Sequence, residues 1–481
     1  MEIILPAFLG EITQRSVSFF IDKLCKETSS ASQPSDDEHL RSKLLRVHVI
    51  VDEAEGRQIR NHAMLEQLKT LQVSMYRGYY VLDTFRYRSY LQEDSSENGH
   101  IQVSHSFALS KFNPAKRIQL CGGSIHGGEK ELQQVIGSLE MIITDANEFV
   151  MFLKGCPPLY RRIYSTYLVM EKCMFGRHVE MEHIINFLMQ KGSPDAGDLD
   201  VLPIVGPAKV GKSTLIEHVC NDERVLTAFS QIVFVTEDDL DEWVTFVRDC
   251  GTVKHRSHAS DGDERVMFIV RVNEDISEAR WSSLYSSSKR HPANGGKMII
   301  CSRSEKIARF GTARTLKLEY LTREAYWYFF KALAFGTTDP EEEPKLAAMT
   351  TEIAASLDNS FVAGNIIASL LRANLSVKFW SMVLACTKEM NKSYHFKFGV
   401  HHVSSLKNIK LIRRLNGSNE YCLILNNCRT TSSQDDVPVM TFQDILLGSD
   451  VPHGKVDVLA WRSSIPPYYS YIFSCEIHKG I

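Results

Sequence analysis

The stretch LPIVGPAKVGKSTLIEHV, residues 202–219, decides the fold of this chain. An apolar run ends at Gly206, and Gly211, Lys212 and Ser213 complete the pattern GxxxxGK[ST] of a phosphate-binding loop. In such a loop, backbone N–H groups and the N-terminus of the next helix converge on a phosphate. The lysine adds a positive charge and the hydroxyl holds Mg²⁺. The alternative is a glycine turn that joins a strand to a helix and binds nothing.

The sequence around this stretch alternates between strand-like and helical segments. The strand-like runs are short, apolar and rich in β-branched residues, and they cover 201–205, 231–235, 266–270 and 297–302. Alternation of this kind predicts a parallel sheet covered by helices. The stretch 202–219 therefore indicates a P-loop NTPase sheet domain.

Hydrolysis by such a domain requires a carboxylate at the end of a strand beside the loop, where it holds the metal. The candidate strand is VMFIV, residues 266–270, and it is followed by Arg271 and Val272. In the normal register Arg271 takes the place of the acid, and its charge repels Mg²⁺. Glu274 or Asp275 could substitute only if the strand slips by several residues; otherwise they form a solvated turn.

The regions on either side of the sheet differ from it in pattern. Leu65, Leu68, Met75, Tyr79 and Leu82 recur at helical spacing, which predicts a helix with one apolar face. Further helices are predicted over about 40–54 and over 129–153, and residues 321–391 are also helical in pattern. The last 90 or so residues contain polar loops and candidate strands, and their fold is not assigned. The predicted fold class is multidomain, α and α/β.

Composition excludes several classes of protein. At 481 residues the chain is long enough for about three domains. The formal net charge of -3 gives no reason to expect a nucleic-acid partner. No apolar run approaches the ~20 residues that span a bilayer, and the N-terminus does not resemble a signal peptide. The 11 cysteines form no CxxC pair. We expect a cytoplasmic protein without a transmembrane segment.

Six motifs follow one another along the chain: YRGYYVLDTF (76–85), MFGRH (174–178), GPAKVGKSTL (206–215), KMIICSRSEKIA (297–308), LEYLTREAYWYFFKALAFG (318–336) and EIAASLDNSFVAGNIIASLLR (352–372). Over roughly residues 1–390 they resemble, in this order, the motifs of the plant NLR disease-resistance proteins, which combine an Rx-type N-terminal helical domain with an NB-ARC nucleotide-binding switch. The six motifs match, in turn, the family's acidic helix, its GRE-type motif, its phosphate loop, its sensor strand and two helical-domain motifs.

The resemblance implies a domain order and a set of nucleotide-binding residues. The implied domains are a helical bundle over 1–95, a linker with one helix over 96–170, a P-loop domain over 171–320, a helical ARC1-like domain or lid over 321–395, and an unassigned region over 396–481. ADP or ATP would contact Phe175, Gly176, Arg177, Gly206, Lys209, Val210, Gly211, Lys212, Ser213, Thr214 and Arg303. Arg177 and its neighbours would face the adenine, Arg303 would take the place of the sensor arginine, and Ser213 would hold Mg²⁺.

The chain departs from the family at three places. Ala208 and Lys209 stand where the loop usually has glycines, and Asn359-Ser360-Phe361-Val362 replaces the family's GLPL. The acids expected after residues 266–270 are missing. The segment 406–416 imitates a single leucine-rich repeat, but a lone repeat cannot bury its own face, so we interpret it as a strand and a turn.

Three functions are compatible with these features. The first is an immune switch that binds ADP or ATP, with weak or absent hydrolysis and with other NLR or signalling proteins as partners of its N-terminal bundle. The second is a nucleotide-free NLR-like scaffold that acts through the same bundle. The third is an unrelated phosphate-loop enzyme such as a small-molecule kinase, but the substrate acid, arginine-rich lid and metal carboxylate of a kinase are not visible. We expect no catalytic residue and, at most, slow ATP hydrolysis.

Overall fold

The structure is a computed structural model of the chain. It describes residues 36–97, 125–159, 174–190, 199–236, 252–256, 265–273, 275–289, 296–390, 410–415, 420–431, 436–448 and 454–479. Residues 1–35 of the predicted bundle, about half of the predicted linker, and Glu274 lie outside these ranges.

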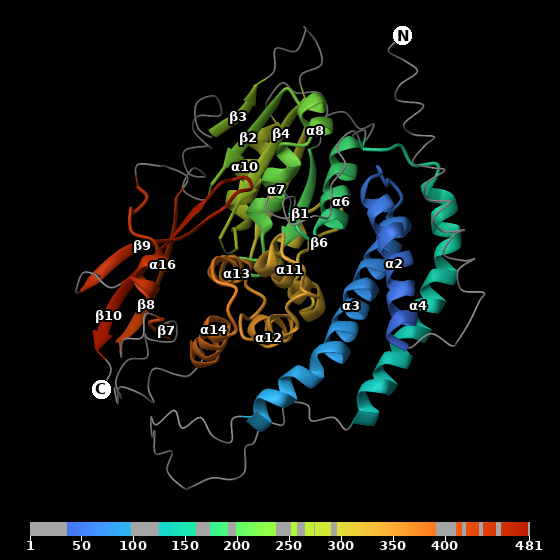
Figure 1. Cartoon of the computed structure of the whole chain (residues 1–481). Helices are drawn as coiled ribbons and strands as arrows, with labels where there is room; N and C mark the ends of the chain where they lie inside the picture. Colours follow the sequence, from blue (N-terminus) through green and yellow to red (C-terminus); the bar gives the residue numbers. More distant parts are fainter. Residues whose placement is uncertain are drawn as a thin grey trace, which may run out of the picture.

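The stretch 202–219 supplies most of β1, which lies between β5 and the edge strand β6 in a six-stranded sheet with the order β3-β2-β4-β5-β1-β6 (Figure 1). All neighbouring strands are parallel except β2 and β3, which are antiparallel. The strands are β1 (Asp200–Val205), β2 (Gln231–Val235), β3 (Thr252–Arg256), β4 (Val266–Arg271), β5 (Lys297–Ser302) and β6 (Leu316–Lys317). The predicted parallel sheet is confirmed, and β3 and β6 are added at its edges.

Helices cover both faces of this sheet, which explains why its strands read as unbroken apolar runs. Alternate residues of each strand enter separate cores: Leu202 and Ile204 of β1 face one side, and Val201 and Val205 face the other. The first core is closed by α6 (His178–Met189), α7 (Lys212–Cys220) and α8 (Glu223–Ala228). The second is closed by α10 (Glu278–Lys289) and the 3₁₀ helix η1 (Glu305–Phe310).

A group of helices follows the sheet in the chain. It contains α11 (Arg323–Phe335), α12 (Pro344–Ala355), α13 (Phe361–Ala373) and α14 (Val377–Met390). The side chains of Thr322 and Ser360 accept hydrogen bonds from backbone N–H groups in the first turns of α11 and α13, so both helices begin at a capping residue. Trp327 and Trp380 are fully buried in this group.

The described N-terminal helices are α2 (Asp36–Glu55), α3 (His62–Glu97) and α4 (Ile125–Leu153). They approach each other closely at Gly78 of α3, where an added Cβ would clash with Leu44 of α2 and lie 3.3 Å from Leu139 Cδ1 of α4. The helix predicted over 129–153 is therefore not an isolated helix in a linker. Its apolar residues, such as Leu132 and Leu139, bury themselves against α2 and α3.

Helix α3 also packs against α11, α12 and α6, which joins the N-terminal helices to the rest of the molecule (Figure 1). We call the contact between α3 and α11 the docking interface. Tyr76 and Tyr79 lie 5.1 Å and 5.6 Å from Tyr328, measured between ring centroids, and Tyr80 lies 5.4 Å from Trp327. The aromatic spacing of residues 76–85 thus serves an interface between segments far apart in the sequence.

The region that the sequence left unassigned contains an antiparallel sheet with the order β7-β8-β10-β9. It consists of β7 (Lys410–Arg413), β8 (Glu420–Thr431), β9 (Lys455–Arg462) and β10 (Ser470–Lys479), with the short helix α16 (Phe442–Leu447) against it. The predicted strand within 406–416 is present as β7. This sheet packs against α13 and α14 on the side of the molecule opposite α2 and α4 (Figure 1).

Candidate nucleotide-binding site

The loop between β1 and α7 has the backbone shape that a phosphate requires. Gly211 has φ +98° at the N-cap of α7, and Lys209 has φ +61°. Left-handed residues of this kind turn successive N–H groups toward one point and form an anion-binding concavity. Gly206 is needed for a different reason, because an added Cβ would clash with the backbone carbonyl of Leu318 and lie 3.1 Å from Leu318 Cβ.

The lysine of the loop folds back over the loop's own carbonyl groups. Lys212 Nζ donates to Gly206 O at 2.6 Å and to Pro207 O at 2.8 Å. Burial lowers the pKa of Lys212 below its ordinary value; Cys301 opposes this effect and Arg303 adds to it. The amino group therefore lies inside the concavity with two neutral partners, and an anion there would give it a charged one.

The proposed sensor residue reaches the same edge of the sheet. β5 ends at Ser302, which is in register with Val205 of β1, and Arg303 follows immediately as an exposed residue. Ser213 and Thr214 form the first turn of α7 and are half-buried. Val210 is fully buried under the loop. The structure thus groups Arg303 with the loop residues.

Arg177 lies on the other side of the loop. It is the N-cap of α6 and is 4% exposed, and its guanidinium donates to Glu319 O and, at 3.5 Å, to Val210 O. Glu180 Oε1 lies 3.6 Å from it. One side chain therefore connects α6, the loop and the segment that leads into α11.

The MFGRH motif also leaves buried polar atoms without a hydrogen bond. Among the described residues, Arg177 Nε and both ring nitrogens of His178 have no partner. Burial, with a contribution from Arg224, lowers the pKa of His178 to about 4, so this ring is neutral at physiological pH. Orphaned polar atoms beside the loop fit a site that a polar ring such as adenine completes.

Gly176 and Phe175 of this motif lie at different places. Gly176 has φ +66°, and an added Cβ would lie 3.0 Å from Leu321. The ring of Phe175 packs against Tyr76 and Tyr328, with centroid distances of 5.5 Å and 6.2 Å. The side chain of Phe175 therefore belongs to the docking interface, and the structure does not group it with the loop side chains.

The strand end that should carry the metal-binding acid carries a cation. Arg271 ends β4 in register with Cys301 of β5, so the strand has not slipped. Its guanidinium donates to Glu217 Oε1 at 3.1 Å and to the Tyr469 hydroxyl at 3.4 Å, and it lies 5.0 Å from the centre of the Phe234 ring. Burial of the guanidinium acts to lower its pKa, but Tyr469, Cys301 and Glu217 outweigh this effect. The pKa of Arg271 therefore lies above its ordinary value.

The remaining described acid after β4 has other partners. Asp275 accepts a hydrogen bond from the backbone N–H of Ile276 and pairs with Lys306 at 3.5 Å and Arg309 at 3.7 Å. These contacts hold its carboxylate against η1. Glu274 lies outside the described residues.

The segment that replaces GLPL has its own hydrogen bonds. Asn359, with φ +54°, donates from Nδ2 to Leu321 O at 2.9 Å, and Tyr326 donates to Ser360 O at 2.8 Å. The substitution thus keeps the turn before α13 attached to the start of α11.

Two contacts at this site were missed in the sequence analysis. The Tyr320 hydroxyl donates to Ala208 O of the loop at 3.0 Å, and Tyr469 reaches Arg271 from the C-terminal sheet. Tyr320 lies inside the motif of residues 318–336, so the sequence carries a signal for its contact. Tyr469 is about 200 residues from Arg271, and no local pattern connects the two.

Comparison with known proteins agrees with this geometry. The family model described as "NB-ARC domain" matches residues 177–340, which include the loop, Arg177, Arg271 and Arg303. The chain carries an NB-ARC domain. Relatives include disease resistance protein RGA2 of Solanum bulbocastanum, 24% identical over 72% of this chain and 35% of that protein. Putative disease resistance RPP13-like protein 1 of Arabidopsis thaliana is 25% identical over 80% of this chain and 37% of that protein.

The chain is thus a relative of the plant NLR disease-resistance proteins, and it spans about a third of the length of these two. An NB-ARC domain is a nucleotide-binding domain of the P-loop class. Among solved structures, one titled "Structure of Drosophila ORC bound to DNA" has a TM-score of 0.32 at 11% identity, covering 50% of this chain and 74% of that chain. In the part of the chain that is described, no helix is long and apolar enough to cross a membrane.

Proposed function

We propose that this chain is an NLR-type protein of plant innate immunity that binds ADP or ATP as a molecular switch and hydrolyses ATP slowly or not at all. The observation that carries the proposal is the phosphate loop, whose left-handed Gly211 and inward Lys212 lie within an NB-ARC domain. Gly206, Lys209, Val210, Ser213 and Thr214 would surround the phosphates and Arg303 would contact the terminal one, with Ser213 as the Mg²⁺ ligand.

A path of direct contacts supports a role for the nucleotide in docking. Tyr320 donates to the loop and Arg177 donates to Glu319, and the next residues, Leu321 and Thr322, lead directly into α11. α11 carries the side chains that hold α3. A nucleotide that rearranges the loop would therefore displace the start of α11 and change the docking interface.

The charges near the phosphates support binding without efficient turnover. For hydrolysis, a bound Mg²⁺ would neutralise charge on the phosphates, and an acid at the end of β4 would be needed to hold the metal. Arg271 instead presents a cation at this position, and Asp275 is paired with Lys306 and Arg309. Binding depends on loop amides, the α7 N-terminus and Lys212, which are all present.

We also propose how the chain is divided and where it acts. The N-terminal domain would extend through α4 to residue 153, the NB-ARC sheet domain would cover about 171–320, the helical ARC1-like domain 321–395 and the β-sheet domain the remainder. The N-terminal domain would bind other NLR or signalling proteins. Cys301, buried next to the loop, is a free thiol, and a reduced thiol there supports the cytoplasm as the compartment.

The second candidate is a nucleotide-free scaffold. It is favoured by the hydrogen bonds of Lys212, which already satisfy the amino group within the loop. Hydrogen–deuterium exchange of the purified chain, with ADP, with ATP and without nucleotide, separates the two. The switch predicts that α3 residues 76–85 exchange at different rates in the three samples. Identical exchange in all three would favour the scaffold.

A further inference from the structure

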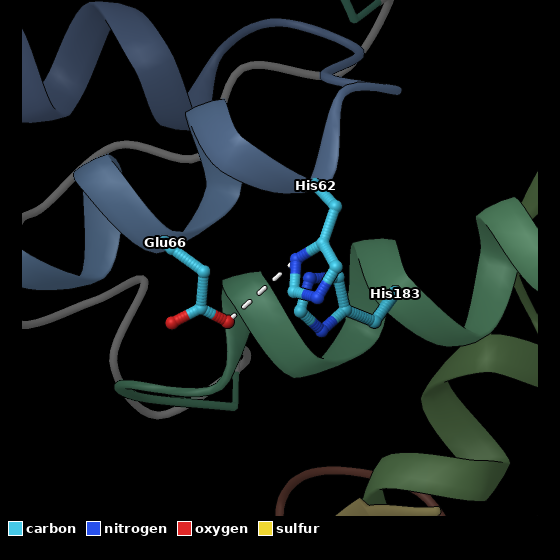
Figure 2. Close-up of side chains that lie close together, drawn as sticks. All are labelled: His62, Glu66 and His183. Carbon is cyan, nitrogen blue, oxygen red and sulfur yellow. Dashed lines mark ion pairs between the residues drawn. The ribbon is translucent and has the colours of Figure 1, made fainter. Parts of the chain in front are cut away.

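His62, Glu66 and His183 form a cluster where α3 meets α6 (Figure 2). One ligand atom of each residue lies within 4.8 Å of those of the other two. His62 Nδ1 lies 3.7 Å from Glu66 Oε1, one helical turn away, and the His62 and His183 rings have centroids 4.7 Å apart at an angle of 82°. Figure 2 shows the Glu66 carboxylate directed at the His62 ring, with the His183 ring next to it.

The surrounding contacts fix the spacing of the two helices at this cluster. On one side, Asn186 of α6 donates from Nδ2 to Ile59 O at 3.0 Å, just before α3 begins. On the other, Lys69 of α3 pairs with Glu180 of α6 at 3.4 Å. His183 lies between these contacts, and its Nε2 atom is buried and has no hydrogen-bond partner among the described residues.

We propose that this cluster is a transition-metal site that ties the N-terminal helices to the NB-ARC domain. Two imidazoles and one carboxylate from fixed helices, with a water molecule in the fourth position, are the donor set of a four-coordinate Zn²⁺. Mg²⁺ and Ca²⁺ prefer oxygen ligands and fit this set poorly. Binding gives the unpartnered Nε2 atom of His183 a partner, and the metal bridges α3 and α6.

Arg314 shows what must move when the metal binds. Its Nη1 atom lies 3.2 Å from His62 Nε2, and a guanidinium can only donate, so Nε2 accepts and Nδ1 holds the ring proton. When a metal binds Nδ1, the Nδ1 proton passes to solvent and Nε2 takes up a proton, so Nε2 can no longer accept from Arg314. The exposed Arg314 side chain turns into solvent, and the His62 ring loses no proton on balance.

The test is calorimetric titration of the full chain, freed of metal by a chelator, with ZnCl₂. We expect one strong site, and we expect His62→Ala and Glu66→Gln each to weaken it at least about tenfold, because a three-ligand site depends on every ligand. Both side chains are more than half exposed, so these variants should fold. His183→Ala removes the third ligand and should weaken Zn²⁺ binding for the same reason. The control is His39→Ala, which removes a histidine 3.5 Å from Glu140 at another helix contact and should leave the affinity unchanged.

A second measurement tests the bridge itself. Zn²⁺ should raise the melting temperature of the wild type and not that of the His62→Ala, Glu66→Gln double variant. Arg314→Ala should bind Zn²⁺ at least as tightly as the wild type. An unchanged Zn²⁺ affinity in the double variant, or a loss of affinity in Arg314→Ala, would overturn the assignment.

Discussion

Arg271 Nη2 at the end of β4 donates to Glu217 Oε1 of α7 at 3.1 Å. The side chain of Glu217 is 4% exposed, so this ion pair is largely removed from water. It connects the strand that should supply a metal-binding acid to the helix that begins at the phosphate loop. The position has therefore gained a structural contact in place of a carboxylate.

Replacing Arg271 by Met should destabilise the NB-ARC domain. The buried Glu217 carboxylate would lose a charged hydrogen bond, which is worth about 1–3 kcal/mol. Melting temperatures of Arg271→Met, Glu217→Gln and the double variant measure the coupling between the two residues. The double variant should be less destabilised than the sum of the single variants. Strictly additive effects would show that the pair does not interact.

ATP turnover by the wild-type chain should stay below about one per minute, because removing the groups that hold the metal and polarise water raises the barrier by several kcal/mol. Phosphate release in the presence of Mg²⁺ measures this rate, and Lys212→Ala gives the background. A faster rate that Lys212→Ala abolishes would mean that an acid other than the one missing from β4 serves the metal.

Lys331→Ala should release α3 from α11. Lys331 pairs with Asp83, and both side chains are about 15% exposed. Burial raises the pKa of Asp83, and Lys331 opposes this, so the carboxylate depends on its partner to stay charged in the interface. Limited proteolysis should cleave residues 76–97 faster in this variant. The matched control is Lys388→Ala, which removes a more exposed pair with Glu352 between α14 and α12; equal cleavage in both variants would contradict the prediction.

Glu55 should make the N-terminal helices less stable as the pH rises. Burial raises its pKa from 4.5 to about 7, although Gln72 donates to its carboxylate at 2.5 Å and opposes the shift. Because the folded state holds this proton more tightly than the unfolded chain does, the stabilisation is complete below pH 4.5 and is lost between pH 4.5 and about 7. Glu55 is partly exposed, so we expect a change of about 1–2 kcal/mol.

The measurement is the melting temperature of the chain at pH 5 and pH 8, compared with that of Glu55→Gln. The difference between the two pH values should be smaller in the variant, because an amide does not titrate. Glu53→Gln is a suitable control, since Glu53 is on the same helix and pairs with Arg57 at 2.6 Å. An identical difference in the wild type and Glu55→Gln would contradict the assignment.

The sequence predicted the elements whose cause is local. The strand over 201–205, the loop and α7 follow from an apolar run, two glycines and a lysine, and each is where it was expected. The place of Arg271 also followed from strand register alone, because β4 continues without a slip to its pairing with Cys301.

The parts that the sequence did not predict depend on contacts between distant segments. The helix over 129–153 was recognised, but its place beside α2 and α3 depends on how Leu44, Gly78 and Leu139 fit together. Phe175 was assigned to the nucleotide because its motif borders the site, but its ring packs at the docking interface. The C-terminal sheet is formed by pairing of strand residues that are up to about 60 residues apart, which no local pattern specifies.

The central claim is that the loop holds an adenine nucleotide, and its most direct test is the nucleotide that the purified chain retains. Denaturing the protein and separating the released nucleotides by ion-exchange chromatography gives both identity and stoichiometry. We predict close to one ADP or ATP per wild-type chain, with ADP in excess, and almost none in Lys212→Ala. Lys209→Ala, which changes a loop lysine outside the GK[ST] motif, should retain at least part of it. No nucleotide in the folded wild type, or an equal amount in folded Lys212→Ala, would contradict the account.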